Sequence, residues 1–444
     1  MDFALLRRLR AISWSAAVPF LLVGVLIVVR NPSPIIRAEF WAEDGSEFFA
    51  LALTEGWKSL LQPVYGYHFL LSRIIACLAT LFPVVAAPYI YAGACLIVDV
   101  IAIGYFSLQR FSWIIPSRPL RILVCVLLAT GPGAGEVMMN LCNLITPLTL
   151  LATLLLIEDP LALSPRRFYW FLFIALSAGH VFFLAPLVLY LGWRNRDVRY
   201  LWLFLSTCPV FVANVVGNHV TGSRNGLLNY DVAVLIPRAL AENFSYRLVI
   251  LPFLGRDKTA QMMAASAPVF WSSCLVGAVL LWVLWRRGSE SRGLQADRPV
   301  VLILAGYACV TSTFAGIMIS RSYAVLQIMR EIGDPLWHVR YAYLPGALAI
   351  VLWATILYRL SLRGLAPKVL SVVLLAVIAA GHLEQWRSYH KRRDAQWPAA
   401  ARVIQQAVDA RRSGTLRDPV SLRVPVQPAR WNEGAITFVL VPNP

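Results

Sequence analysis

Long apolar runs, separated by short basic segments, recur along almost the whole chain and constrain its fold more than any other feature. They fall at residues 12–29, 88–108, 120–134, 143–157, 168–179, 180–193, 200–216, 268–285, 300–319, 341–358 and 368–383. A helix needs about 20 apolar residues to cross a bilayer, and the shorter runs fit if they are tilted or partly shielded. The sequence therefore predicts an all-α polytopic membrane protein with about eleven transmembrane helices.

The composition agrees with this interpretation and shows why the positive charge does not point to nucleic acid. Of the 444 residues, 59% are hydrophobic and only 14% are charged, which is typical of membrane proteins. A net charge of +17 would suggest a nucleic-acid partner for a soluble protein. Here the basic residues lie between the apolar runs, so we expect the lipid bilayer as a partner and no nucleic acid.

The distribution of Lys and Arg predicts the orientation of the chain. With the N-terminus in the cytoplasm, the inward loops hold 18 Lys and Arg in 63 residues, and the outward loops hold 12 in about 142. An excess of basic residues on the cytoplasmic side is the usual pattern. We therefore expect residues 30–87, 217–267 and the tail beyond 384 outside the cytoplasm. The basic run 391–393, close to the last apolar run, opposes this orientation.

The first outward segment carries a dense group of acids. The stretch EFWAEDGSEFF, residues 39–49, holds Glu39, Glu43, Asp44 and Glu47 among aromatic residues. Ionisable side chains at a membrane boundary are costly and commonly functional, so we interpret this stretch as a polar site within an interfacial aromatic belt. The alternative is a helix cap made by Asp44 with Glu47 three residues on, but a cap leaves Glu43 unexplained.

Two amphipathic stretches follow in the same segment. Residues 43–62 alternate apolar and polar faces at helical spacing, and residues 66–82 do so less clearly, with His68, Ser72 and Arg73 on one side. Treating 66–82 as a membrane span would place the basic loop 109–121 outside. We therefore expect two juxtamembrane helices that lie at the outer interface.

Two further outward turns carry polar residues. The turn GPGAGEVMMNLCN, residues 131–143, contains Glu136, Asn140 and Asn143, and its glycines do not have the spacing of a phosphate-binding loop. Glu136 either faces the site or is only a helix-end acid. His180 marks the next turn, as an interfacial histidine or as an auxiliary site residue.

Late in the chain, an arginine stands where an outward loop re-enters the membrane. Arg340 and Tyr341 close the loop 320–340 and open an apolar run. A guanidinium there can bind a lipid phosphate through two hydrogen bonds, whereas the simpler alternative is an arginine that snorkels to the interface. Asp99 is the only acid in the middle of a run, and we expect it to be neutral and hydrogen-bonded.

The chain divides into a transmembrane domain, residues 1–384, and a small tail, residues 385–444. The tail contains a helical stretch at 396–412 and two strand-like runs, VSLRVPVQP and AITFVLVP. It is too short for an independent enzyme domain. The seven cysteines lie in apolar stretches without a CxxC pair, which favours core packing over metal or redox roles.

This layout resembles the GT-C superfamily of integral-membrane glycosyltransferases, and more closely its bacterial polytopic members with an AEDG-like first outward loop. The resemblance is carried by Glu43-Asp44-Gly45, the two interfacial helices, Glu136 in the second turn, and Arg340-Tyr341. It implies transfer of a sugar from a polyprenyl-phosphate donor to a hydroxyl of a glycan, lipid or protein acceptor. The site would face outward from a bacterial inner membrane, with Asp44 as the base. The chain departs from the family at the second site, where no acidic pair accompanies Glu136.

The residue types suit this chemistry independently of the resemblance. A carboxylate can take the proton of the attacking hydroxyl and stabilise an oxocarbenium-like transition state. The departing phosphate needs a positive charge, which Arg340, Arg73 or a divalent ion on Asp44 and Glu136 could supply. Oxygen ligands suit Mg²⁺, Mn²⁺ or Ca²⁺. The sequence does not choose between these sources of charge.

Two other classes of function remain open. A transporter or lipid flippase would show two related halves and polar breaks at mid-membrane depth, and the sequence shows no internal repeat. A membrane scaffold without catalytic activity would make the acid cluster incidental.

The orientation can be tested with thiol reagents that do not cross the membrane. Ser46→Cys, Asn229→Cys and Thr415→Cys should all react in intact cells, since all three positions are predicted to lie outside. If position 415 reacts only after permeabilisation, the chain has one span fewer or more than predicted.

Overall fold

The computed structural model describes residues 14–41, 43–64, 68–131, 133–158, 164–208, 299–309, 340–387, 396–427 and 435–442, with residues 251–254 and isolated positions up to 286. The described part is mostly helical and contains three short strands. The predicted loop 217–267, the span 268–285 and the second halves of the spans 200–216 and 300–319 lie almost wholly outside the described residues.

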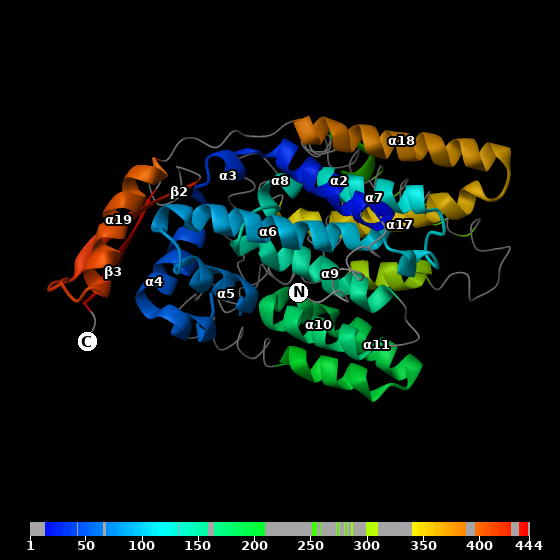
Figure 1. Cartoon of the computed structure of the whole chain (residues 1–444). Coiled ribbons are helices and arrows are strands. Elements are labelled where there is room, and N and C mark those ends of the chain that lie inside the picture. Colours follow the sequence, from blue (N-terminus) through cyan, green and yellow to red (C-terminus); the bar gives the residue numbers. More distant parts are fainter. Residues whose placement is uncertain are drawn as a thin grey trace, which may run out of the picture.

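Elongated helices lie side by side and form the body of the molecule (Figure 1). They are α2 (Trp14–Arg30), α6 (Ala87–Gly104), α7 (Arg118–Thr130), α9 (Ile145–Ile157), α10 (Pro165–Ser177), α11 (Ala185–Asn195), α17 (Arg340–Ser361) and α18 (Leu365–Arg387). Helix α9 is central. It is buried over its whole length and packs against α6, α10 and α17, as expected for a helix that is apolar on every side.

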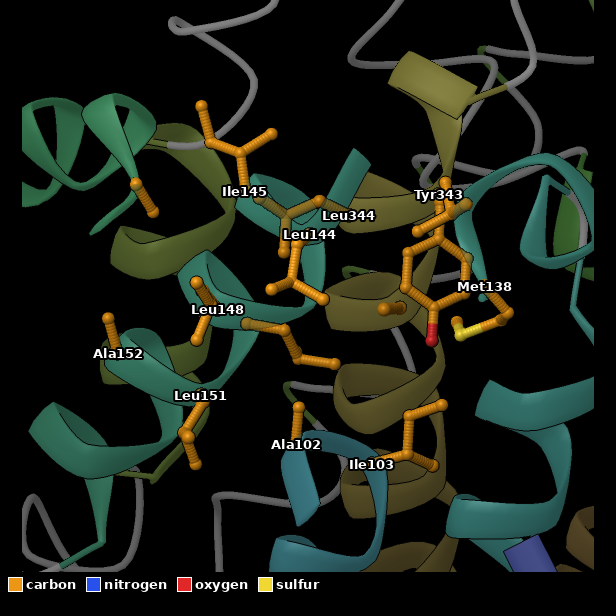
Figure 2. Packing of buried hydrophobic residues seen from close by; sticks show 14 of the residues in the cluster. Ala102, Ile103, Met138, Leu144, Ile145, Leu148, Leu151, Ala152, Tyr343 and Leu344 are labelled. Atoms are coloured by element: carbon orange, nitrogen blue, oxygen red, sulfur yellow. The ribbon is translucent and has the colours of Figure 1, made fainter. Parts of the chain in front are cut away.

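Side chains of α6, α9 and α17 meet in the interior (Figure 2). Leu148 and Leu151 of α9 lie near Ala102 of α6 and Leu344 of α17. Thr149 and Thr153 donate hydrogen bonds to the carbonyl oxygens of Ile145 and Thr149, at 2.7 and 2.8 Å, so these hydroxyls are satisfied without leaving the helix.

Contacts at the helix ends show that successive helices run in opposite directions. At one end, Arg110 forms an ion pair of 2.9 Å with Glu158, joining the turns that follow α6 and α9. At the other end, the Arg30 guanidinium at the end of α2 donates to the carbonyl oxygen of Gly131, 3.1 Å away, just after α7. We call this second end the site end, because the acid motif and the turn 131–143 both lie there.

Three helices of the described part are long and apolar enough to span a membrane: Val84–Ser107, Tyr343–Ser361 and Leu365–Leu383. The second is 83% buried in the protein, whereas the third is only 22% buried. The exposed face of α18 includes Val369, Val372, Val373 and Val377. Such an apolar outer face suggests membrane association.

Several of the predicted spans are shorter helices than the apolar runs suggested. Helices α7, α9 and α10 each have 13 residues and α11 has 11. Turns interrupt the apolar runs and shorten the helices. Helix α7 ends at Thr130, before the glycine turn 131–135, and a 3₁₀ helix (η7, Gly179–Leu184) replaces the start of the run 180–193. The described residues therefore show three membrane-length helices, and a count of eleven stays a prediction.

The segment between α2 and α6 forms short helices at the site end. It comprises α3 (Ser33–Ile36), β1 (Phe40–Trp41), the π-helix η1 (Asp44–Ala50), α4 (Leu51–Glu55), η2 (Gly56–Leu61), α5 (Leu70–Ala79) and η3 (Val84–Ala86). The two predicted helical stretches are thus present, the first of them interrupted at Gly56, whose φ of +57° suits glycine. The longest of these helices, α5, has only 10 residues, about half of what a helix needs to cross a bilayer.

The tail forms the predicted helix, α19 (Trp397–Arg412), and two strands, β2 (Val420–Gln427) and β3 (Ala435–Leu440). The two predicted strand-like runs are thus strands, and they pair antiparallel with each other. The sequence did not predict that β2 also pairs in parallel with β1, with Phe40 opposite Val426 and Trp41 opposite Gln427. Figure 1 shows α19 and β3 beside α4 at one end of the molecule.

Trp397 is the main apolar anchor of the tail, and its removal is a test of this packing. The side chain is 1% exposed. Its ring lies 4.8 Å from Phe40 and 5.8 Å from Phe49, and its Nε1 donates to the carbonyl oxygen of Val85. Trp397→Ala should lower the free energy of unfolding by about 3–5 kcal/mol. The control is Trp57→Ala, at an exposed tryptophan. If the melting temperature of Trp397→Ala is no lower than that of Trp57→Ala, the packing role of Trp397 is contradicted.

Candidate functional site

The acid motif begins an uncommon type of helix. Asp44 is the first residue of η1, a π-helix of seven residues, and π-helical turns occur frequently at functional sites. Glu43 occupies the N-cap position, and its side chain makes no capping hydrogen bond. The alternative, a helix cap made by Asp44, is therefore not the arrangement found.

The Asp44 carboxylate binds the second outward turn instead. Its Oδ1 accepts a hydrogen bond of 2.8 Å from the backbone N–H of Cys142, and its Oδ2 accepts one of 3.2 Å from the N–H of Leu141. The side chain is buried, with 4% exposed. Two N–H donors favour the ionised carboxylate, because they replace the water that burial removes. Asp44 thus joins two loops that lie almost a hundred residues apart in the sequence.

A second carboxylate holds the same turn from the side of α6. The Oδ2 of Asp99 accepts a hydrogen bond of 2.8 Å from the N–H of Met139, whose φ is +55°. A methionine in this left-handed conformation is uncommon and needs support from its surroundings. Asp44 and Asp99 together bind three backbone N–H groups between residues 139 and 142, so the shape of this turn depends on both.

The polar residues of the turn also bind one another. Asn140 is buried, and its Oδ1 accepts a hydrogen bond of 3.2 Å from the N–H of Asn143. The Asn143 Nδ2 donates to the backbone oxygen of Glu136, 2.9 Å away. Glu136 itself lies half-buried in the short helix α8 (Ala134–Val137), which packs against α17. The structure therefore places Glu136 beside the start of α17, and no described hydrogen bond joins it to Asp44.

Three buried polar atoms without a partner belong to residues next to Asp44 or to the turn that it binds. They are Oε2 of Glu43, Nδ2 of Asn140 and the hydroxyl of Tyr91, none of which has a hydrogen-bond partner within the described part of the chain. Buried polar groups are nearly always hydrogen-bonded, so such atoms commonly face a ligand or water. Tyr91 lies close to Asp44, and its ring lies 5.3 Å from Phe40.

Tyr91 is not among the residues that the sequence singles out. A tyrosine near the outer end of an apolar run is common in any membrane protein, so the sequence held no signal that separates it from the aromatic belt.

Arg73 is committed to the interior of the first outward segment. Its side chain is fully buried, its guanidinium donates to the backbone oxygens of Glu47 and Gln62, and it stacks over Phe48 at 5.2 Å. Burial lowers the pKa of Arg73 from its ordinary value. Arg73 therefore stabilises the fold of the first outward segment. To make the predicted contact with a substrate phosphate, its buried guanidinium would have to be reached from the solvent or the bilayer.

Two titratable groups lie close to Arg73. Burial raises the pKa of Glu47, and the charge of Arg73 opposes this effect only in part. Burial lowers the pKa of His68, and the same arginine lowers it further. His68 is therefore neutral at pH 7 and can accept or donate one hydrogen bond. It belongs to the Arg73 side of the segment, and no described hydrogen bond links it to Asp44.

The remaining predicted residues lie at a distance from η1 or outside the description. The turn η7 with His180 packs against α9, α10 and α11. Arg340 and Tyr341 are the first two residues of α17, and their side chains lie outside the described residues. In the described part of the chain, no three His, Cys, Asp or Glu residues gather into a group that could hold a metal ion.

Comparison with protein-family models, with curated proteins and with solved structures gives no match to this chain.

The raised pKa of Glu47 predicts how stability depends on pH. The pKa of Glu47 is higher in the folded protein than in the unfolded chain, where it has the ordinary value of 4.5. At a pH above both of these pKa values, the folded protein is destabilised by the buried charge, and this destabilisation disappears when the pH falls below 4.5. Glu47→Gln should therefore be more stable than the wild type at pH 7, and the difference should shrink as the pH falls toward 4.5. Thermal unfolding at several pH values measures this, with the exposed Glu55→Gln as control. If the difference in stability between Glu47→Gln and the wild type is the same at all pH values, the raised pKa of Glu47 is contradicted.

Proposed function

We propose that this protein is a membrane glycosyltransferase of the GT-C type that moves a sugar from a polyprenyl-phosphate donor to an acceptor hydroxyl. The proposal is supported above all by one observation. The neighbouring carboxylates Glu43 and Asp44 are buried at the site end, together with the partnerless polar atoms of Glu43, Tyr91 and Asn140. Such a group is costly for a purely structural segment and suited to a polar substrate.

The proposed reaction assigns different tasks to the two carboxylates. Each oxygen of Asp44 accepts one backbone N–H, so the carboxylate is oriented by the turn 131–143, and a carboxylate is the group that can take a proton. Glu43 lies beside it, and its Oε2 has no hydrogen-bond partner among the described residues. The acceptor oxygen attacks the anomeric carbon, its proton passes to the carboxylate, and the bond from that carbon to the phosphate oxygen breaks. Polyprenyl phosphate leaves.

The leaving phosphate is assigned to the start of α17. Arg340 and Tyr341 open this helix, which packs against α8 and its Glu136. A fixed guanidinium can form two parallel hydrogen bonds with a phosphate. In this assignment Asn140 and Tyr91 bind hydroxyls of the sugar or the acceptor, while His68 and His180 have auxiliary roles.

The finer layout is part of the same proposal. The chain has about eleven spans, a cytoplasmic N-terminus and an extracytoplasmic site and tail, in a bacterial inner membrane. The sided distribution of basic residues supports it, as does the position of the acid motif and the tail at one end of the bundle.

One observation favours a transporter or flippase as the second candidate. Asp99 lies fully buried in the membrane-length helix Val84–Ser107, and its Oδ1 has no hydrogen-bond partner among the described residues. Ionisable groups at such depth often mark a substrate or proton path. The two candidates differ in chemistry. Deletion of a transferase removes one sugar linkage, whereas deletion of a flippase leaves the finished lipid-linked sugar inside the cell.

Substitution of the two carboxylates tests the proposal. Glu43→Gln keeps the shape of a side chain that makes no capping bond, and Asp44→Asn removes the base but keeps only one of its two N–H bonds. We expect each to lower the transfer rate by about 10²-fold or more, and Asp44→Asn also to lower the melting temperature. The readout is the missing glycan in complemented deletion cells.

The exposed acid Glu55 on the same segment supplies the matched control, Glu55→Gln, which should behave as wild type. Normal glycan yield from both Glu43→Gln and Asp44→Asn would exclude this carboxylate pair from the chemistry.

Replacement of Arg340 tests the phosphate contact. Arg340→Lys should lower transfer at least tenfold without loss of expression, because a point charge does not reproduce two parallel hydrogen bonds. Arg37→Lys, at an exposed arginine of the site end, is the control. An Arg340→Lys protein as active as Arg37→Lys would assign the phosphate to another cation.

A further inference from the structure

The tail contacts the acid motif at its most crowded point. A Cβ built on Gly45 would lie 2.7 Å from Cγ1 of Val426 and 3.2 Å from Cγ1 of Val424, both in β2. Contacts below 3.0 Å require one partner to move. Val426 also lies opposite Phe40 in the parallel pairing of β1 with β2. The residue next to Asp44 is therefore fitted against a strand almost four hundred residues later in the chain.

Independent contacts hold the rest of the tail against the first outward segment. Besides Trp397, Gln405 of α19 accepts a hydrogen bond of 2.7 Å from the N–H of Val84. Arg411 donates to the backbone oxygen of Leu53, at 2.7 Å, and Arg412 donates to that of Thr80, at 2.8 Å. These bonds reach α4, η3 and the turn after α5. Helix α19 thus binds the first outward segment on several sides, and β2 packs against α19.

We infer that the C-terminal tail is a working part of the carboxylate site, and that Val426 is a positioning residue that sets the place of Asp44 through Gly45. Gly45 is the second residue of η1 and Asp44 the first. A shift at Gly45 therefore moves the Asp44 carboxylate relative to the N–H groups of Leu141 and Cys142. Displacements of about 1 Å at a reacting group can lower a rate 10²-fold.

The role of Val426 rests on the proposed function, because only transfer reports the position of Asp44. The experiment is a double-mutant cycle in the full-length protein, with Gly45→Ala, Val426→Ala and both together. Gly45→Ala adds the methyl group that meets Val426, and Val426→Ala removes the methyl groups that it meets. Glycan yield in complemented deletion cells and the melting temperature of the purified protein are both measured.

We expect Gly45→Ala to lower the transfer rate about 10- to 100-fold. The double variant should transfer sugar at least about tenfold faster than Gly45→Ala. Gly93→Ala is the glycine control, since a Cβ there meets nothing within 4 Å. Val439→Ala, at an exposed valine of β3, is the strand control.

The outcomes separate the tail contact from the transfer reaction. Recovery of both melting temperature and transfer in the double variant supports the positioning role. If the melting temperature recovers and transfer does not, the positioning role is overturned, and the contact between positions 45 and 426 serves stability only. Wild-type transfer in Gly45→Ala also overturns it. If deletion of the gene changes no glycan, the proposed function fails, while coupling between positions 45 and 426 in the melting temperatures would still show that the tail docks.

Discussion

The hydrogen bonds from the N–H groups of Leu141 and Cys142 to the Asp44 carboxylate are the interaction on which the site depends. A buried carboxylate is stable only when donors replace its water, and backbone N–H groups buried in the turn need acceptors. Each side therefore satisfies the other. The side chain of Asp99, which the sequence predicts to be hydrogen-bonded, likewise accepts a hydrogen bond from the N–H of Met139. Two aspartates from different parts of the chain thus fix a turn that has little regular structure of its own.

The helices around this turn place it at a boundary. Successive helices run in opposite directions, so the acid motif, the turn 131–143, the start of α17 and the tail all gather at one end. Apolar residues cover the outer face of α18, while α9 and α17 fill the interior. In the proposed function, a lipid-linked donor and a polar acceptor would meet at this end of the bundle.

Buried polar residues near the acid motif differ in how far the backbone satisfies them. Arg73 is fully buried and donates to two backbone oxygens of its own segment, so its charge stabilises the fold of the first outward segment. Glu43 is also buried, and its side chain makes no capping hydrogen bond. Burial alone does not distinguish the two residues, and each has one polar atom without a hydrogen-bond partner among the described residues. The difference lies in how many partners the nearby backbone supplies.

The sequence by itself determined the helical class, the membrane-length runs at 88–108, 341–358 and 368–383, and the helix and strands of the tail. These follow from local periodicity and apolar length, which need no partner elsewhere in the chain. It also singled out Glu43, Asp44, Glu136 and Asn140 as polar residues at helix ends. Only the tertiary structure decided that Asp44 binds residues 141 and 142, that Arg73 is internal, and that β2 pairs with β1 beside Gly45. Such contacts join positions far apart in the sequence, and their energy depends on distances that no local pattern of residues records.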